Sequence, residues 1–294
     1  MHVSEVFILF FRGFVPRRAR NRRALAMLLP VAAMLLSSCG TTGGIAEPEI
    51  IETEIRSEKL PEELDGLRIV LVSDLHVDSR RSPEYLPRIV ERMNALSPDL
   101  VALAGDLVDG TAAELVPQLE ALRELKTRHG VFGVPGNHEY GFEYRDYMAL
   151  LPFLGVTMLE NSHRMIHPRF AVAGITDPAA KKHHLPGPDL SAALEGIPKH
   201  AFVLLLAHRP QYCTAASKRG VDLQLSGHTH GGLVRGLEPL IVHGSDGFVA
   251  GTYQVGNTIL YVSRGAVTWD LGRPASQMRF GVPAEIALLI LRRP

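Results

Sequence analysis

The chain has 294 residues, 31 basic and 31 acidic side chains, and a hydrophobic fraction of 46%. This length suffices for one large domain or two small ones with a sizeable core, and the hydrophobic fraction excludes disorder over most of the chain. Six of the basic residues but only one of the acidic residues lie in residues 1–38, which leaves 25 basic and 30 acidic side chains in the remainder. This acidic balance argues against nucleic acid as a partner, because nucleic-acid binding depends on a basic surface.

Residues 1–38 have the composition of an export signal. An arginine-rich segment precedes the apolar run Ala24–Leu36, whose 13 residues match a signal peptide and fall short of the roughly 20 that a membrane span needs. The following LSSC resembles the lipobox of bacterial lipoproteins, so we expect Cys39 to carry lipid and to anchor the protein in the cell envelope. A soluble secreted protein and an uncleaved anchor are the alternatives. Arg22 and Arg23 leave the twin-arginine export route open beside the general one.

Residues 39–48 have the Gly, Thr and Pro composition of a linker, and residues 49–294 are predicted to form one α/β domain. The second cysteine, Cys213, lies in a predicted helix and is expected to be a small buried side chain. If Cys39 is lipidated, no disulfide can form within the chain.

Strand-like and helix-like segments alternate along this domain. Helical periodicity marks residues 82–96 and 111–130, and we expect the second helix to end at Gly130. Continuous apolar runs are typical of strands that are covered on both faces. Such runs, and therefore predicted strands, lie within the segments 67–74, 99–106, 131–139, 201–208, 221–228 and 284–291.

Five of these runs end in a side chain that can bind a metal. In open α/β sheets, ligands gather at the carboxyl ends of the strands, so we expect these five side chains to meet at one edge of the sheet. They are Asp74, Asp106, Asn137, His208 and His228.

Each motif alone has a simpler structural explanation. Asp74 and His76 are two residues apart, so an extended backbone would point both toward one cation, but a capping Asp and a surface His fit equally well. Asp106 and Asp109 could cap the next helix, and His208 could be a core histidine. That all five strand ends carry such side chains only for structural reasons is much less probable. Together the motifs offer enough ligands for two metals.

The turn Gly136-Asn137-His138-Glu139 explains an asparagine better than it explains His138. In LSGHTHGG, His228 and His230 share a face by the same two-residue spacing, and the flanking glycines let the backbone approach a ligand closely. Both segments therefore add side chains to the predicted site.

The order D-x-H, GDxxD, GNHE, H and GHTH is similar to that of the calcineurin-like metallophosphoesterase superfamily. The opening GLRIVLVSDLH and the ending PAEIALLIL resemble its membrane-associated bacterial phosphodiesterase-like branch. The resemblance implies a four-layer α/β/β/α sandwich that hydrolyses a phosphoester through a metal-bound hydroxide.

The resemblance also implies roles for individual residues. The first metal would be held by Asp74, His76 and His230, and the second by Asn137, His208 and His228, with Asp106 bridging both. His138 would be the general acid, and Asp109 would orient it. Mixed nitrogen and oxygen ligands suit Mn, Fe or Zn.

Departures from the superfamily narrow the substrate. Gly110 stands where protein Ser/Thr phosphatases have an arginine, and Asp109 stands where purple acid phosphatases have a tyrosine. We therefore expect a small-molecule, envelope or lipid-linked phosphoester, with a diester favoured over a monoester. Arg209 and Arg235 are candidate phosphate contacts. The alternative function is a non-catalytic, metal-dependent binding lipoprotein of the cell envelope, which the presence of His138 and of every expected ligand disfavours.

Overall fold

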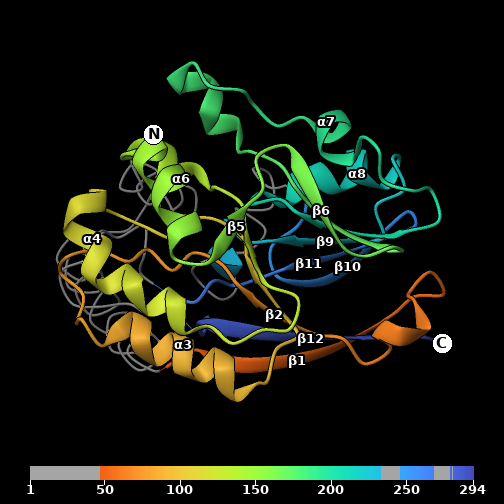
Figure 1. Cartoon of the computed structure of the whole chain (residues 1–294), viewed down its shortest axis with the longest axis horizontal. Helices are drawn as coiled ribbons and strands as arrows, with labels where there is room; N and C mark the ends of the chain where they lie inside the picture. Colours follow the sequence, from red (N-terminus) through yellow and green to blue (C-terminus); the bar gives the residue numbers. More distant parts are fainter. Residues whose placement is uncertain (1–46, 233–245, 268–278, 280) are drawn as a thin grey trace, which may run out of the picture.

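The computed structural model describes residues 47–232, 246–267, 279 and 281–294, and these residues form two six-stranded sheets that face each other (Figure 1). The first sheet has the order β1 (Glu49–Arg56), β12 (Glu285–Arg292), β2 (Arg68–Val72), β3 (Leu100–Leu103), β4 (Val131–Gly133) and β5 (Val156–Met158). The second has the order β10 (Gly251–Val255), β11 (Thr258–Val262), β9 (Leu223–Ser226), β8 (Phe202–Leu206), β7 (Phe170–Gly174) and β6 (Ser162–His167).

The helices are short and connect these strands. The α-helices are α3 (Tyr85–Ala95), α4 (Ala112–Leu119), α5 (Asn137–Gly141), α6 (Tyr144–Phe153), α7 (Leu190–Leu194) and α8 (Cys213–Ser217). The 3-10 turns are η1 (Glu62–Leu64), η2 (Glu120–Glu124), η3 (Pro178–His183), η4 (Pro210–Tyr212) and η5 (His230–Gly232).

Each strand that precedes a predicted ligand runs parallel to at least one neighbour, although β2 is antiparallel to β12 on its other side. β2, β3, β4 and β5 pair in parallel in the first sheet, and β7, β8 and β9 do so in the second. The carboxyl ends of neighbouring parallel strands lie at the same edge of a sheet. Each sheet therefore gathers its strand ends, and the side chains that follow them, at one edge.

Alternate residues of each strand face different layers of the molecule, as the two-residue period of a strand requires. Leu71 of β2 and Leu204 of β8 belong to the same buried cluster between the sheets. Val70 faces the other way, into a cluster with α3, α4 and α6, and Leu205 packs in a cluster with α7 and α8. The order of layers is thus α/β/β/α, which confirms the predicted fold class.

The second predicted helix is shorter than the sequence pattern indicated. α4 ends at Leu119, the chain tightens into η2, and Leu125 is already extended. Pro117 has no N–H to donate to the helical ladder, and the chain must straighten to enter β4. The prediction that this helix continues to Gly130 is therefore wrong.

The predicted export signal (1–38), Cys39 and most of the linker lie outside the described residues, and so does Arg235. Within the described ranges, no helix is both long enough and apolar enough to cross a membrane. Cys213 is fully buried in α8, as expected, and burial raises the pKa of its thiol to about 12.

Candidate metal centre

The five predicted strand ends meet, but they come from two sheets. Asp74, Asp106 and Asn137 follow strands of the first sheet, whereas His208 and His228 follow strands of the second. The expectation of one edge of a single sheet is therefore wrong, because the chain enters the second sheet after β5. A direct contact joins the two edges: the backbone N–H of His228 donates to Asp74 Oδ1 and Oδ2 at 3.2 and 3.1 Å.

The backbone at the candidate ligands is turned rather than extended. Non-glycine residues rarely adopt a positive φ, yet five of the nine that do so in the described chain are candidate ligands. The expectation that an extended backbone aims the paired residues of SDLH and GHTH in one direction is wrong. Such strained conformations persist where the surrounding structure holds them, and they gather at functional sites. The five are Asp74 (52°), His76 (43°), Asp106 (52°), His228 (71°) and His230 (49°).

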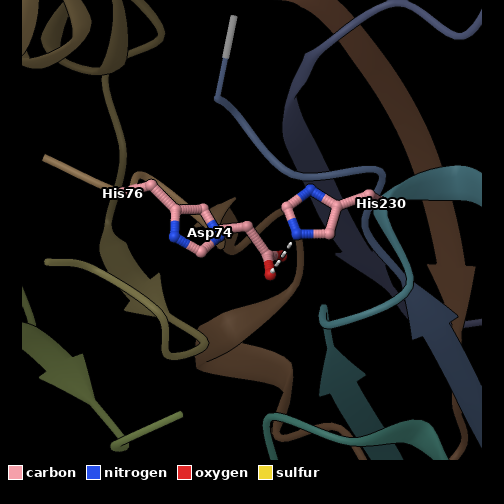
Figure 2. A group of neighbouring side chains, drawn as sticks. All are labelled: Asp74, His76 and His230. Carbon is pink, nitrogen blue, oxygen red and sulfur yellow. Dashed lines mark ion pairs between the residues drawn. The ribbon is translucent and has the colours of Figure 1, made fainter. Parts of the chain in front are cut away.

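The first group of candidate ligands contains Asp74, His76 and His230 (Figure 2). Their ligand atoms all lie within 4.8 Å of one another, and His230 Nε2 is 3.5 Å from Asp74 Oδ1. His76 Nε2 is buried and has no hydrogen-bond partner among the described residues. A buried polar atom without a partner is costly, and one carboxylate with two imidazoles suits a divalent transition metal. The group therefore fits a metal ion.

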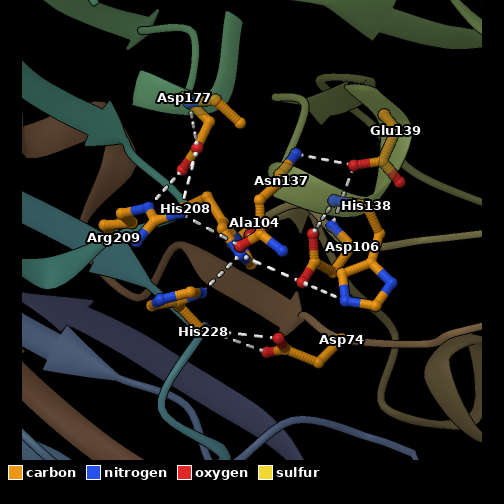
Figure 3. A network of polar contacts seen from close by, with 12 residues as sticks. Asp74, Ala104, Asp106, Asn137, His138, Glu139, Asp177, His208, Arg209 and His228 are labelled. Atoms are coloured by element: carbon orange, nitrogen blue, oxygen red, sulfur yellow. Dashed lines mark hydrogen bonds and ion pairs between the residues drawn. The ribbon is translucent and has the colours of Figure 1, made fainter. Parts of the chain in front are cut away.

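The second group contains Asp106, His208 and His228 (Figure 3). His208 Nε2 lies 3.2 Å from Asp106 Oδ2 and 3.2 Å from His228 Nδ1. The other ring nitrogen of His208 is 2.8 Å from the carbonyl oxygen of Ala104. A hydrogen bond donated there would leave the Nε2 lone pair of His208 for a metal, an arrangement common among metal-binding histidines. The second group therefore also fits a metal ion.

Asp106 connects the two groups. It takes part in the second group and in a further cluster with His76 and His138, whose ligand atoms again lie within 4.8 Å of one another. Its carboxylate is thus placed as a bridging ligand would be. Asn137 lies at the side of the second group, where its Oδ1 is 3.4 Å from Arg209 Nη2 (Figure 3).

His208 and His228 have opposite pKa shifts although they touch. Burial alone would lower the pKa of His208, but the carboxylate of Asp106 outweighs it and raises that pKa to about 10. Burial, reinforced by the charges of His208 and Arg209, lowers the pKa of His228 to about 3. Without metal, the pair therefore holds its proton on His208 near neutral pH.

Asp109 holds two imidazoles at once. Its Oδ1 is 2.5 Å from His138 Nδ1 and 3.0 Å from His76 Nδ1. The sequence predicted only the contact with His138. Burial opposes ionisation of Asp109, but the hydrogen bonds with His138 and His76 outweigh it and lower its pKa.

His138 differs from the buried histidines around it because its side chain is 35% exposed, against 1% for His76 and 0% for His208. Burial would lower its pKa, but the hydrogen bond to Asp109 and the charge of Asp106 raise that pKa to about 9. His138 is thus a protonated and accessible side chain beside the cluster, as a general acid must be.

Glycines let the ligand loops approach each other closely. A Cβ on Gly136 would overlap Asp106 Oδ1, and a Cβ on Gly227 would overlap Asp74 Oδ2. A Cβ on Gly105 would lie 2.8 Å from His208 Nδ1. These contacts explain why glycine precedes a candidate ligand in all three motifs.

Sequence reasoning missed Glu139, which is fully buried. Its carboxylate accepts hydrogen bonds from the backbone N–H groups of Gly136 (2.6 Å), Leu107 (2.6 Å) and Asp106 (3.1 Å). It therefore ties the loop after β3 to the start of α5. A signal was available, because a Glu at the third position of a helix is one half of a capping box.

Two further residues near the site were also missed. Asp177 contacts Arg209, with 2.7 Å between Oδ2 and Nε, and fully buried Arg279 places its Nη2 3.2 Å from His230 Nδ1. Both lie in segments without a motif, so no sequence pattern indicated them.

The residues of this site lie within a region that is similar to a known protein family. The family model for the calcineurin-like phosphoesterases matches residues 67–232. A transmembrane protein with a metallophosphoesterase domain from Danio rerio is 33% identical, over 100% of this chain and 72% of that protein. An uncharacterized metallophosphoesterase of Helicobacter pylori strain J99 is 36% identical, over 98% of this chain and 79% of its own length. The metallophosphoesterase YkuE of Bacillus subtilis is 30% identical, over 94% of this chain and 98% of its own length.

Proposed function

Because the chain belongs to the calcineurin-like phosphoesterase family, we propose that its strand-end site hydrolyses a phosphodiester. As a member of this family, the protein is a metal-dependent phosphoesterase that uses two divalent metals. The proposal rests on two neighbouring groups of Asp and His ligands that Asp106 connects, with His138 beside them. The first group would hold one metal, the second group together with Asn137 would hold the other, and Asp106 would contact both.

The protein side chains supply what the metals do not. When bound, the two metals would activate a water molecule and stabilise the charge that develops on the phosphoryl oxygens. His138, which holds a proton near neutral pH, would donate it to the oxygen of the leaving alcohol. Asp109 fixes Nδ1 of His138 and thereby leaves Nε2 to deliver that proton.

The charge around the site supports a diester over a monoester. A monoester carries up to two negative charges at the phosphoryl group, whereas a diester carries one. Asp177 balances the charge of Arg209, and Gly110 supplies no cation after Asp109. The accessible surface beside the second ligand group therefore suits a singly charged phosphoryl group.

The test compares two chromogenic esters on protein loaded with Mn²⁺. We expect faster hydrolysis of bis(p-nitrophenyl) phosphate than of p-nitrophenyl phosphate, and replacement of His138 by Ala should slow turnover while the metal content stays at two per chain. Faster turnover of the monoester would overturn the diester preference. Turnover of neither ester at full metal occupancy would instead favour a metal-dependent binding protein.

We also propose that the protein is exported and anchored in the cell envelope through Cys39, where it acts on an envelope or lipid-linked substrate. The support is the apolar run Ala24–Leu36 and the LSSC that follows it. In cells, Cys39→Ser should move the protein from the membrane fraction to the soluble fraction. Equal turnover of soluble and lipid-linked diesters by the detergent-solubilised protein would count against a lipid-linked substrate.

A further inference from the structure

Asp177 belongs to neither group of candidate ligands, but it contacts Arg209, whose guanidinium lies beside the second group. Its side chain is fully buried, and its carboxylate contacts one edge of the Arg209 guanidinium at two points. Oδ2 is 2.7 Å from Nε, and Oδ1 is 3.3 Å from Nη2. Such two-point contacts fix the plane of a guanidinium as well as its distance.

The strands bring these two residues together. Arg209 directly follows His208 at the end of β8, and Asp177 follows β7, the neighbouring parallel strand. The guanidinium thus comes from the same strand end as a candidate ligand. Asp177 contacts the Nε and Nη2 groups of this guanidinium, and Figure 3 shows the pair beside His208 and Asn137.

The guanidinium extends from Asp177 toward the second ligand group. Nη2 lies 3.4 Å from Asn137 Oδ1, while 24% of the Arg209 side chain stays exposed. A guanidinium only donates hydrogen bonds, so a ligand that approaches this exposed surface must be an acceptor. An oxyanion at the metal centre is such a ligand.

We propose that Asp177 is a positioning residue that holds Arg209 in place to bind a non-bridging oxygen of the substrate phosphoryl group. The inference rests on the proposed function and identifies the side of the site at which the phosphoryl anion binds. An arginine that is free in solution loses side-chain entropy when it binds. Here the buried carboxylate has already ordered Arg209, so the anion binds a preorganised donor.

A purely structural role for Asp177 makes a different prediction. Oδ1 of Asp177 also accepts a hydrogen bond from the backbone N–H of Ala179 at 2.8 Å and thereby caps η3. If capping were its only role, its replacement would lower stability and leave anion binding unchanged. Phosphate affinity therefore separates the two roles.

The experiment measures the dissociation constant of inorganic phosphate by calorimetry on the Mn²⁺-loaded protein, together with KM and kcat for bis(p-nitrophenyl) phosphate. The variants are Arg209→Ala, Asp177→Asn and the double variant. Asp222→Asn is the matched control, because Asp222 Oδ1 lies 3.0 Å from Lys59 Nζ and its Oδ2 accepts from the Val203 N–H at 2.9 Å. Asp222 thus also combines an ion pair with a hydrogen bond from a backbone N–H, but it lies near the start of β8, at the end away from Arg209.

We expect Arg209→Ala to weaken phosphate binding by about tenfold or more, which is the size of one charge-assisted hydrogen bond. Asp177→Asn should weaken it by about threefold to tenfold and raise KM more than it lowers kcat. The double variant should be no weaker than Arg209→Ala, since Asp177 acts through Arg209. Asp222→Asn should bind phosphate as the unchanged protein does, and all four should hold two metals.

Wild-type phosphate affinity in Asp177→Asn would overturn the inference, and so would fully additive effects in the double variant. Loss of a metal from Arg209→Ala would overturn it too, because Arg209 would then act by positioning Asn137. Phosphate binding does not depend on turnover. If the phosphate affinities of the variants rank as expected but the protein hydrolyses neither ester, the proposed function is wrong and the phosphate-binding role of Arg209 and Asp177 still holds.

Discussion

His208 and His228 show how one carboxylate changes the chemistry of neighbouring imidazoles. Both rings are largely withdrawn from solvent, but Asp106 Oδ2 lies 3.2 Å from His208 Nε2 and keeps that ring protonated. His228 lacks so close a carboxylate and stays neutral. A histidine binds a metal through a neutral nitrogen. In the metal-free protein, His228 is therefore ready to bind and His208 is not.

Metal loading near neutral pH should consequently release protons. The pKa of His208 is raised to about 10, so the ring carries a proton below that pH and must lose it on ligation. We expect at least one proton per chain, because His208 must lose its proton and His228 has none to lose. Calorimetric Mn²⁺ titrations in buffers of different ionisation enthalpy measure the number of protons released per chain. A heat of binding that is the same in every buffer would show that His208 is already neutral.

The glycines beside the ligands provide a second test on single residues. Gly136 has an extended backbone that any residue can adopt, so Gly136→Ala acts only through the overlap of its Cβ with Asp106. We expect this variant to lose metal affinity by about tenfold or more, since the carboxylate of Asp106 must move.

Gly141→Ala at the other end of α5 is the control, because a Cβ there would meet nothing within 4 Å. Metal content after dialysis, measured by mass spectrometry, compares the two variants. Equal occupancy in Gly136→Ala and Gly141→Ala would mean that Asp106 does not hold metal in this position.

The candidate ligands were predictable from sequence because each follows a continuous apolar run, and such runs mark buried strands. Asp177 and Arg279 were not predictable in this way. Their contacts with Arg209 and His230 join segments 32 and 49 residues apart, and no local pattern encodes such pairings. The role of Glu139 could have been predicted, because it follows from the place of this residue in the first turn of α5.

Glu139 connects the loop after β3 to the start of α5 through four backbone hydrogen bonds. Its Oε1 accepts hydrogen bonds from the N–H groups of Leu107 (2.6 Å) and Val108 (3.3 Å), while Oε2 accepts those of Asp106 (3.1 Å) and Gly136 (2.6 Å). Two segments that carry Asp106, Asn137 and His138 are thereby held in a fixed relation. The position of three site residues depends on this one carboxylate.

We expect Glu139→Gln to lower the free energy of unfolding by about 1–3 kcal/mol, because an amide keeps one acceptor oxygen and leaves buried N–H groups without a partner. Urea unfolding of the metal-free protein measures the change. Glu143→Gln is the control, since the side chain of Glu143 is exposed and, within the described residues, its carboxylate accepts one backbone hydrogen bond, from the N–H of Ala112. A loss that is no larger for Glu139 than for Glu143 would contradict this account of the loop.

Three of the strands that the sequence analysis missed share a physical reason, whereas the buried strands β7 and β11 do carry apolar residues and could have been predicted. β1 and β10 are largely exposed edge strands, and β6 is an edge strand with a bulge. None of them has the apolar run that marked the central strands. Their pairing is decided by the sheet beside them, so the number of strands and the existence of a second sheet could not be read from hydropathy.

At the scale of the molecule, the site lies where two sheets meet. Asp74 and Asp106 are carried by the first sheet, and His208 and His228 by the second, while the cluster between the sheets fixes their relative position. Asp106 and His208 therefore meet only if both sheets pack correctly. The apolar runs alone could indicate the ligands individually, whereas the two-sheet sandwich that brings them together was implied only by the family resemblance.

Anomalous X-ray diffraction from Mn²⁺-loaded crystals tests the central claim, that the strand ends of both sheets hold two metals around one carboxylate. We expect two anomalous peaks about 3.5–4 Å apart, one beside Asp74, His76 and His230 and the other beside His208 and His228, with Asp106 in contact with both. A single peak, or two peaks of which neither contacts Asp106, would contradict it.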